Sequence, residues 1–242
     1  MSPLRQRMIE DMQLRGYSAT TQEAYARAVR QLSDHVHHGP DKVTEEKLRQ
    51  HFLYLANEKK CARSTATIAL CGIKFFYEHT LRRDWPTLRL VRPAPDRKLP
   101  IVLSREEVRQ ALANVRTPVY GACLTTIYSC GLRLMEGARL QVGDVDSARM
   151  VLYIHGKGKR DRYVPLPERT LALLRQFWKT HRSPEWLFPA PARRGRKQEG
   201  GPVPGTSLQA AFYRAWKKTG ILKRAHVHTL RHYSESRTMP SC

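Results

Sequence analysis

The stretch GLRLMEGARLQVGDVDSARMVLYIHGKGKRDRYVPLP, residues 131–167, carries the sharpest change of pattern in the chain. It begins at Gly131, directly after the apolar run Tyr120–Cys130, and a glycine in this place predicts the end of a helix. Two short β-like runs, Met150–Ile154 and Arg162–Val164, lie further along on either side of a turn rich in Gly and Lys. This arrangement predicts an antiparallel hairpin that follows a helix.

Helical patterns flank this hairpin on both sides. Upstream, Ser104 and Glu107 have the spacing of a capping box at the start of a helix. Downstream, Glu168–His181 and Ser207–Lys218 carry apolar residues at helical spacing, and a last helix begins near His228. The chain from residue 100 onward is therefore expected to be mainly α with a small antiparallel β element.

The first 82 residues read as four short amphipathic helices. Gly16 is expected to close the first of them. Thr20 or Thr21 is expected to cap the second, Thr44 the third and Ser64 the fourth, because Ser and Thr are favoured N-cap residues. Four such helices predict a small bundle that forms a domain of its own.

A basic, proline-rich segment separates the two parts. Residues 83–99 contain three prolines among several Arg and Lys. Since proline lacks an amide donor and fixes φ, we expect an extended linker here. It would join a helical domain at residues 1–82 to a second domain at residues 100–242.

The whole chain is strongly basic, with 43 Lys and Arg against 21 Asp and Glu and a net charge of +22. Residues 1–82 carry 13 basic and 9 acidic side chains, whereas residues 83–242 carry 30 and 12. So large an excess destabilises a compact chain unless a polyanion neutralises it. Duplex DNA is therefore the expected partner, and the second part is expected to hold most of the phosphate contacts.

Cysteine usage and hydropathy favour a cytoplasmic location. The five cysteines are scattered without a CxxC pair, which argues against both a disulfide framework and a zinc site. No apolar run reaches the ~18 residues of a membrane span, and the N-terminus does not resemble a secretory signal. We expect a bacterial, nucleoid-associated protein with no membrane partner.

Three short segments of the second part carry side chains suited to phosphate chemistry: Gly131–Glu136, Gly156–Arg162 and His228–His232. Each alone is unspecific, and the Gly-Lys turn lacks the spacing of a P-loop. In this order, with Lys157 placed 157 − 133 = 24 residues after Arg133, they resemble the tyrosine recombinase (phage integrase) family, above all integrases carried by integrons and transposons. The helical first part, with SATTQEAYARAVRQL near its start, is similar to the core-binding, SAM-like domain of that family.

The resemblance implies a catalytic role for four residues. In the family a tyrosine hydroxyl attacks a DNA phosphate, without metal or cofactor, and forms a phosphotyrosine link. Arg133 and Arg231 would clamp the non-bridging oxygens of that phosphate. Lys157 would give a proton to the departing 5′ oxygen, and His228 would bind the phosphate or help the nucleophile lose its proton. The implied partners are duplex DNA at a recombination site and other recombinase protomers on it.

Further residues are expected to support these four. Glu136 is expected to be a structural partner that orients an arginine. A metal site of His226, His228 and His232 is conceivable from their spacing, but it is not expected, because the family needs no metal. Contacts to the DNA backbone are expected from six basic residues: Arg92, Arg97, Lys98, Lys159, Arg160 and Arg162.

The sequence departs from the family pattern after its His-x-x-Arg-His motif. Only 242 − 231 = 11 residues follow Arg231, and none is a tyrosine in the place of the nucleophile. Tyr233 would lie about 200° round a helix from Arg231, at about 100° per residue, and so would point away from the phosphate. We expect a catalytic domain truncated before its nucleophile, with an apolar face uncovered around Leu124, Ile127 and Leu230.

Two functions remain open at this point. The first is site-specific DNA recombination and integration, here by a truncated and inactive form that still binds DNA. The second is a non-catalytic DNA-binding protein that inhibits full-length recombinases by occupying their sites. An unstable product without function is a third possibility, which a measured affinity for DNA would exclude.

Overall fold

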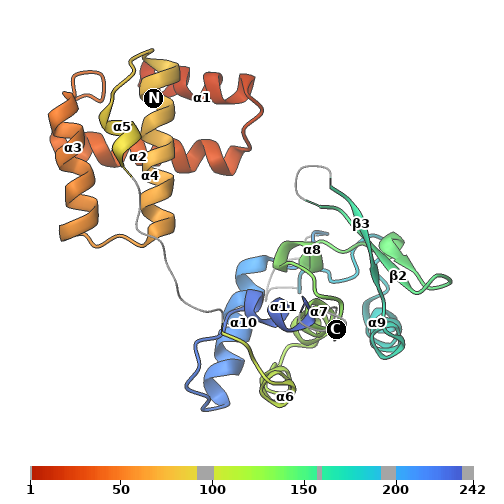
Figure 1. Cartoon of the computed structure of the whole chain (residues 1–242). Coiled ribbons are helices and arrows are strands. Elements are labelled where there is room, and N and C mark those ends of the chain that lie inside the picture. Colours follow the sequence, from red (N-terminus) through yellow and green to blue (C-terminus); the bar gives the residue numbers. More distant parts are fainter. Residues whose placement is uncertain (1, 92–100, 157–159, 192–199, 236–242) are drawn as a thin grey trace, which may run out of the picture. The chain divides into compact units, whose positions relative to one another are not determined.

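The chain divides into two compact units, residues 1–98 and 99–242, and each has a hydrophobic core of its own (Figure 1). The computed structural model describes residues 2–91, 101–156, 160–191 and 200–235. Among these residues, no helix combines the length and the apolar character that crossing a membrane requires.

The first unit is entirely helical in its described part. Its elements are α1 (Pro3–Leu14), α2 (Ala19–Val36), α3 (Glu45–Leu53) with a π-helical turn at Tyr54–Glu58, α4 (Arg63–Phe75) with a π-helical turn at Phe76–Thr80, and α5 (Thr87–Leu90). Helices α2 and α4 cross closely at Gly72, where an added Cβ would lie 2.9 Å from the Cα of Tyr25. This close crossing holds the bundle together around buried residues such as Leu32 and Ile73.

The predicted helical first domain is confirmed, and so are two of its helix ends. Gly16 follows α1 with φ +72°, a left-handed conformation that glycine adopts without steric cost. Thr44 caps α3, because its side chain accepts a hydrogen bond from the amide of Lys47 at 3.4 Å. These two positions are set by local chemistry that the sequence displays directly.

The predicted caps of α2 and α4 are wrong. Ser18, not Thr20 or Thr21, caps α2 and accepts from the amide of Thr21. Helix α4 begins before Ser64 and has Ala62 at its N-cap, with no side-chain cap. In both helices the helical backbone begins several residues before the first apolar residue of the pattern. The pattern alone therefore places the first turn too late.

Part of the stretch predicted as an extended linker is folded onto the first unit. Residues 87–90 form α5, and Leu88 is buried in the core. Glu45 accepts hydrogen bonds from the amide and hydroxyl of Thr87 at 2.9 and 2.8 Å, and Trp85 stacks on Tyr77. Burial of these apolar groups explains why this part is not extended; the remainder of the predicted linker, residues 92–99, lies outside the described residues.

The second unit is mainly α with a small antiparallel sheet, as predicted. Its elements are α6 (Arg105–Ala113), α7 (Pro118–Cys130), α8 (Leu134–Ala138), a 3-10 turn (Val142–Asp144), β1 (Val145–Asp146), β2 (Val151–Ile154), β3 (Arg162–Pro165), α9 (Glu168–His181), α10 (Gly205–Lys218) and α11 (Val227–Glu235). The predicted hairpin is β2 and β3, with Tyr153 opposite Tyr163. The capping box of Ser104 and Glu107 at the start of α6 is also confirmed.

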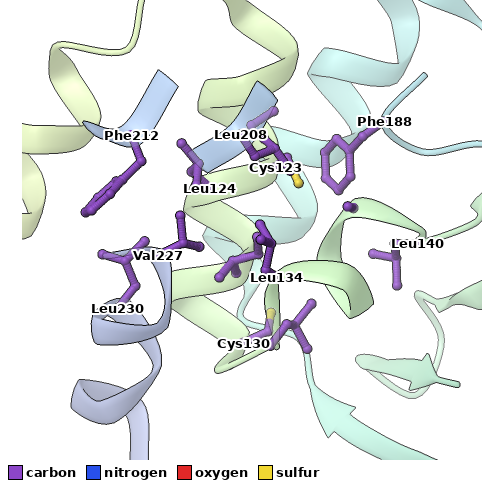
Figure 2. Close-up of a cluster of buried hydrophobic side chains, with 14 of the residues drawn as sticks. Cys123, Leu124, Cys130, Leu134, Leu140, Phe188, Leu208, Phe212, Val227 and Leu230 are labelled. Carbon is purple, nitrogen blue, oxygen red and sulfur yellow. The ribbon is translucent and has the colours of Figure 1, made fainter. Parts of the chain in front are cut away.

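Helix α7 is the centre of the second unit, with α6, α9, α10 and α11 against it. Figure 2 shows Leu208 and Phe212 of α10 and Val227 and Leu230 of α11 around Leu124 of α7. Leu124, Leu230 and the neighbouring Ile127 are fully buried. The predicted exposed apolar face at these residues is therefore wrong, because α10 and α11 cover it.

Candidate active site

The turn between α7 and α8 positions Arg133. Helix α7 ends at Gly131, which takes φ +62° and donates its amide to the carbonyl of Ile127. The chain reverses there, and Arg133 becomes the N-cap of α8. Its side chain is half exposed, at 52%, while Leu132 and Leu134 on either side are buried. The glycine and the two leucines thus hold the backbone of Arg133 and leave its guanidinium accessible.

Glu136 binds two arginines from different elements. One oxygen accepts from Nη1 of Arg133 at 2.8 Å and the other from the Arg133 amide at 2.8 Å. Arg162 of β3 donates from Nη1 and Nη2 to the same two oxygens, at 2.9 and 2.8 Å. Burial by itself would raise the pKa of the Glu136 carboxyl, but the hydrogen bonds from Arg162 and Arg133 lower it to about 2. The prediction that Glu136 orients an arginine is confirmed.

Helix α11 carries His228 and Arg231 one turn apart, on the same face. His228 is exposed, and Arg231 is half-buried. Val227 and Leu230 anchor the helix in the core beside α7. The buried pair therefore fixes the direction in which Arg231 and His228 leave the helix.

A cavity of about 1120 Å³ lies between α6, α7, α9 and β3, and Arg231 and Arg162 both line it. Gly131, two residues before Arg133, belongs to the same lining. Three further arginines of α6 and α9 also line the cavity, together with apolar residues of the same helices: Arg105, Arg109 and Arg169. Such a lining suits an anionic ligand, because guanidinium groups bind phosphate and carboxylate oxygens through paired hydrogen bonds. The sequence had singled out only Arg162 and Arg231 among these five.

The neck of the β2–β3 hairpin is closed by Asp161. Its carboxylate accepts from the amide of Gly156 at 3.0 Å and from the hydroxyl of Tyr153 at 2.7 Å. An added Cβ at Gly156 would lie 1.9 Å from the carbonyl oxygen of Arg160, so the neck requires glycine. The contact by which Asp161 closes the hairpin was not predicted from the sequence. An Asp that directly follows a segment rich in Gly and Lys would have indicated such a contact.

The other predicted site residues divide between described and undescribed parts of the chain. Arg160 is exposed on the hairpin, and Tyr233 belongs to α11, with its side chain outside the described part. Five predicted residues lie wholly outside the described residues: Lys157, Arg92, Arg97, Lys98 and Lys159. The structure thus links Arg133 and Arg162 through Glu136 and places Arg162 and Arg231 at one cavity.

Two family models match the chain, one for each unit. Residues 4–87 match the phage integrase N-terminal SAM-like domain, and residues 102–239 match the phage integrase family. The putative integrase/recombinase y4qK of Sinorhizobium fredii is 41% identical over 234 residues, which are 96% of this chain and 74% of that protein. The tyrosine recombinase XerC of Halalkalibacterium halodurans is 28% identical over 196 residues, 76% of this chain and 65% of that protein.

A solved structure shows the same fold. A lambda integrase dimer bound to a COC′ core site superposes with a TM-score of 0.76 over 96% of this chain and 87% of that one. The identity is only 14%, so this likeness concerns the fold. Together with the matches along both units, it leads to one conclusion: the chain belongs to the phage integrase family of tyrosine recombinases, with a SAM-like domain followed by a catalytic domain.

Proposed function

We propose that this chain binds duplex DNA at a recombination site and takes part in site-specific recombination at the bacterial nucleoid. The observation that carries the proposal is the joining of Arg133 and Arg162 by Glu136, beside a cavity that Arg231 also lines. The excess of 30 basic over 12 acidic side chains in residues 83–242 supports it, because phosphate neutralisation dominates DNA affinity. Family membership supports other recombinase protomers as further partners.

The proposed chemistry assigns one role to each of four residues. Arg133 and Arg231 bind the non-bridging oxygens of the scissile phosphate, where negative charge accumulates in the transition state. Lys157 protonates the leaving 5′ oxygen, since a flexible ammonium group is a suitable general acid. His228, exposed one turn before Arg231, binds the same phosphate or assists deprotonation of the nucleophile. No metal and no cofactor has a part in this scheme.

We further propose that no tyrosine of these 242 residues is the nucleophile. In-line attack needs a hydroxyl about 3–3.5 Å from phosphorus, on the side opposite the leaving oxygen. Tyr233 follows Arg231 by two residues on α11, about 200° away around the helix axis. This placement supports a chain that binds DNA without forming a covalent link to it.

The test is incubation with a nicked suicide substrate that carries a recombination site, followed by native and denaturing electrophoresis. The expected result is a slowed band in the native gel that disappears on denaturation. A protease-sensitive band that survives denaturation, and that Tyr233→Phe abolishes, would show that the chain has a nucleophile of its own. Absence of any slowed native band would contradict DNA binding itself.

The placement of Tyr233, about 200° from Arg231 around α11, supports a second candidate function. A chain that binds recombination sites and cannot cleave them acts as an inhibitor of full-length recombinases. Addition of this chain to a full-length relative should then slow recombination in proportion to the sites it occupies. Recombination that proceeds at an unchanged rate with all sites occupied would argue against the inhibitor.

A further inference from the structure

Arg133 and Arg162 share Glu136 unequally. Arg162 uses both of its terminal nitrogens on the carboxylate, in a two-pronged pair, and its side chain is 33% exposed. Arg133 uses only Nη1 of its guanidinium, and its side chain is 52% exposed. The carboxylate between them is 7% exposed. Arg162 thus makes a two-pronged contact with Glu136, whereas about half of the Arg133 side chain remains exposed.

The charges of the three side chains explain why two arginines are needed. Two positive charges and one negative charge leave the group with one net positive charge. Without Arg162, the nearly buried carboxylate would have Arg133 as its only arginine, and the pair would be neutral. An ion pair that is held by a buried carboxylate is a poor partner for an incoming phosphate, because the phosphate must compete with it.

The same contact connects two elements. Glu136 belongs to α8, whose N-cap is Arg133, and Arg162 is the first residue of β3. Lys157 lies between β2 and β3 in the sequence. The pair of Arg162 and Glu136 therefore ties the hairpin of Lys157 to the turn of Arg133 across 26 residues of chain.

We propose that Arg162 is a positioning residue for Arg133 and not a contact to DNA. It neutralises Glu136, so that Arg133 keeps an unbalanced charge for a phosphate, and it fixes the hairpin against α8. The proposal rests on the proposed function, because it assigns to Arg133 a phosphate of bound DNA.

The experiment compares three variants with a matched control. Arg162→Met, Glu136→Gln and the double variant change the net charge of the group to zero, to plus two and back to plus one. Arg149→Met is the control, since Arg149 is an exposed arginine in the turn between β1 and β2 of the same sheet, pairs with Asp146, and its loss removes the same charge. The readouts are the affinity for a mixed-sequence DNA duplex and the shift of the Arg133 Nε–Hε resonance on addition of that duplex.

Arg162→Met should reduce the shift of the Arg133 Nε–Hε resonance on addition of the duplex by about tenfold. A coupling of this size is expected for residues in one salt-bridge network. Arg149→Met should leave that shift unchanged. The double variant should recover to within about threefold of the parent, because its net charge is restored. A merely structural role predicts the opposite, since the double variant lacks every ionic contact that holds β3 to α8.

Two results would overturn the proposal. One is an equal effect of Arg162→Met and Arg149→Met on the Arg133 response; the other is a double variant that binds no better than Arg162→Met. If the parent itself binds no duplex, the proposed function fails, and a carboxyl NMR titration still decides the positioning role. The pKa of Glu136 should rise in Arg162→Met and stay at about 2 in Arg149→Met; no difference between the two would contradict it.

If Arg162→Met fails to fold, Arg162→Lys tests the positioning role in its place. Lysine keeps the positive charge and loses the two-pronged geometry. It should preserve the Arg133 response to the duplex and speed hydrogen exchange at the Arg133 amide, which donates to Glu136. Loss of the response in Arg162→Lys, with exchange at that amide unchanged, would contradict the proposal.

Discussion

At the scale of single residues, Glu136 determines the local electrostatics of the second unit. Its carboxylate is nearly buried, and it stays ionised because Arg162 and Arg133 donate hydrogen bonds to both oxygens. Removal of one member of such a network leaves the others desolvated and incompletely paired, which costs more than the pair contributes.

Glu136→Gln should therefore lower the free energy of unfolding of the second unit by about 2 kcal/mol near neutral pH. The folded-state pKa lies at about 2, below the usual 4.5, so the contribution is complete above pH 4.5 and is lost as pH falls towards 2. Urea titrations between pH 2.5 and 7 should show a shallower acid limb in the variant. Identical acid limbs in parent and variant would refute the assignment.

In the first unit, folding disfavours the charged form of His51, whereas it favours the charged form of Glu136. Burial, followed by the charges of His35 and Lys59, lowers its pKa from 6.5 to about 4. The unfolded chain therefore binds a proton more readily, and stability should fall as pH drops from 6.5 to 4. His51→Leu should remove this loss. Hydrogen exchange of the α2 and α3 amides at pH 4.5 and 7 measures it, and an unaltered pH dependence in the variant would exclude His51 as its source.

The sequence predicted a set of site residues but not all their partners. Arg133, His228 and Arg231 stand in motifs whose spacing is short. The partner of Arg162 could not be predicted in that way, since Glu136 lies 26 residues earlier and no periodicity connects a strand residue to a helix turn across that distance. Only the folded chain shows that the arginine faces a carboxylate.

At the scale of elements, long periodic segments and the β2–β3 hairpin were predictable, whereas the shortest helices and strand β1 were not. Helix α9 has the predicted bounds Glu168–His181, because four turns display the helical period fully. Strand β1 has two residues and α8 has five, too few to show a period of either kind. Helix α5 was not predicted because prolines lie beside it in the sequence; the burial of Leu88 and the hydrogen bonds of Thr87 to Glu45 explain why it forms.

Helix α8 packs on α7 through Gly137. An added Cβ at Gly137 would lie 2.4 Å from Cγ1 of the fully buried Ile127. Gly137→Ala should therefore destabilise the second unit by about 1–3 kcal/mol, the usual cost of overpacking, and should displace Arg133 at the N-cap of the same helix. Urea unfolding measures the stability loss.

Gly143→Ala is the matched control for this substitution. No atom lies within 4 Å of a Cβ added at Gly143, in the 3-10 turn that follows α8. Its stability should be unchanged or raised by up to about 1 kcal/mol, because alanine restricts the unfolded chain. Equal effects of the two substitutions would mean that the contact between Gly137 and Ile127 does not limit how α8 packs.

At the scale of the whole molecule, the uneven charge predicts an uneven part in DNA binding. Residues 1–98 and 99–242 each have a core and can be produced separately. If six to ten phosphates are neutralised in all, log K should fall with log salt by about 0.9 per phosphate. The second unit should account for most of that slope in fluorescence anisotropy titrations. Equal slopes for the two units, or a flat response of the whole chain, would contradict the charge argument.

The separation of the two cores also determines how the chain tolerates change during evolution. Among the described residues, no buried member of one core belongs to the other. A cavity opened in one core therefore leaves the packing of the second intact, and selection acts on two stability margins instead of one. Substitutions at Leu32 and at Leu124 should consequently combine without epistasis, so a damaging change in one half finds no suppressor in the other.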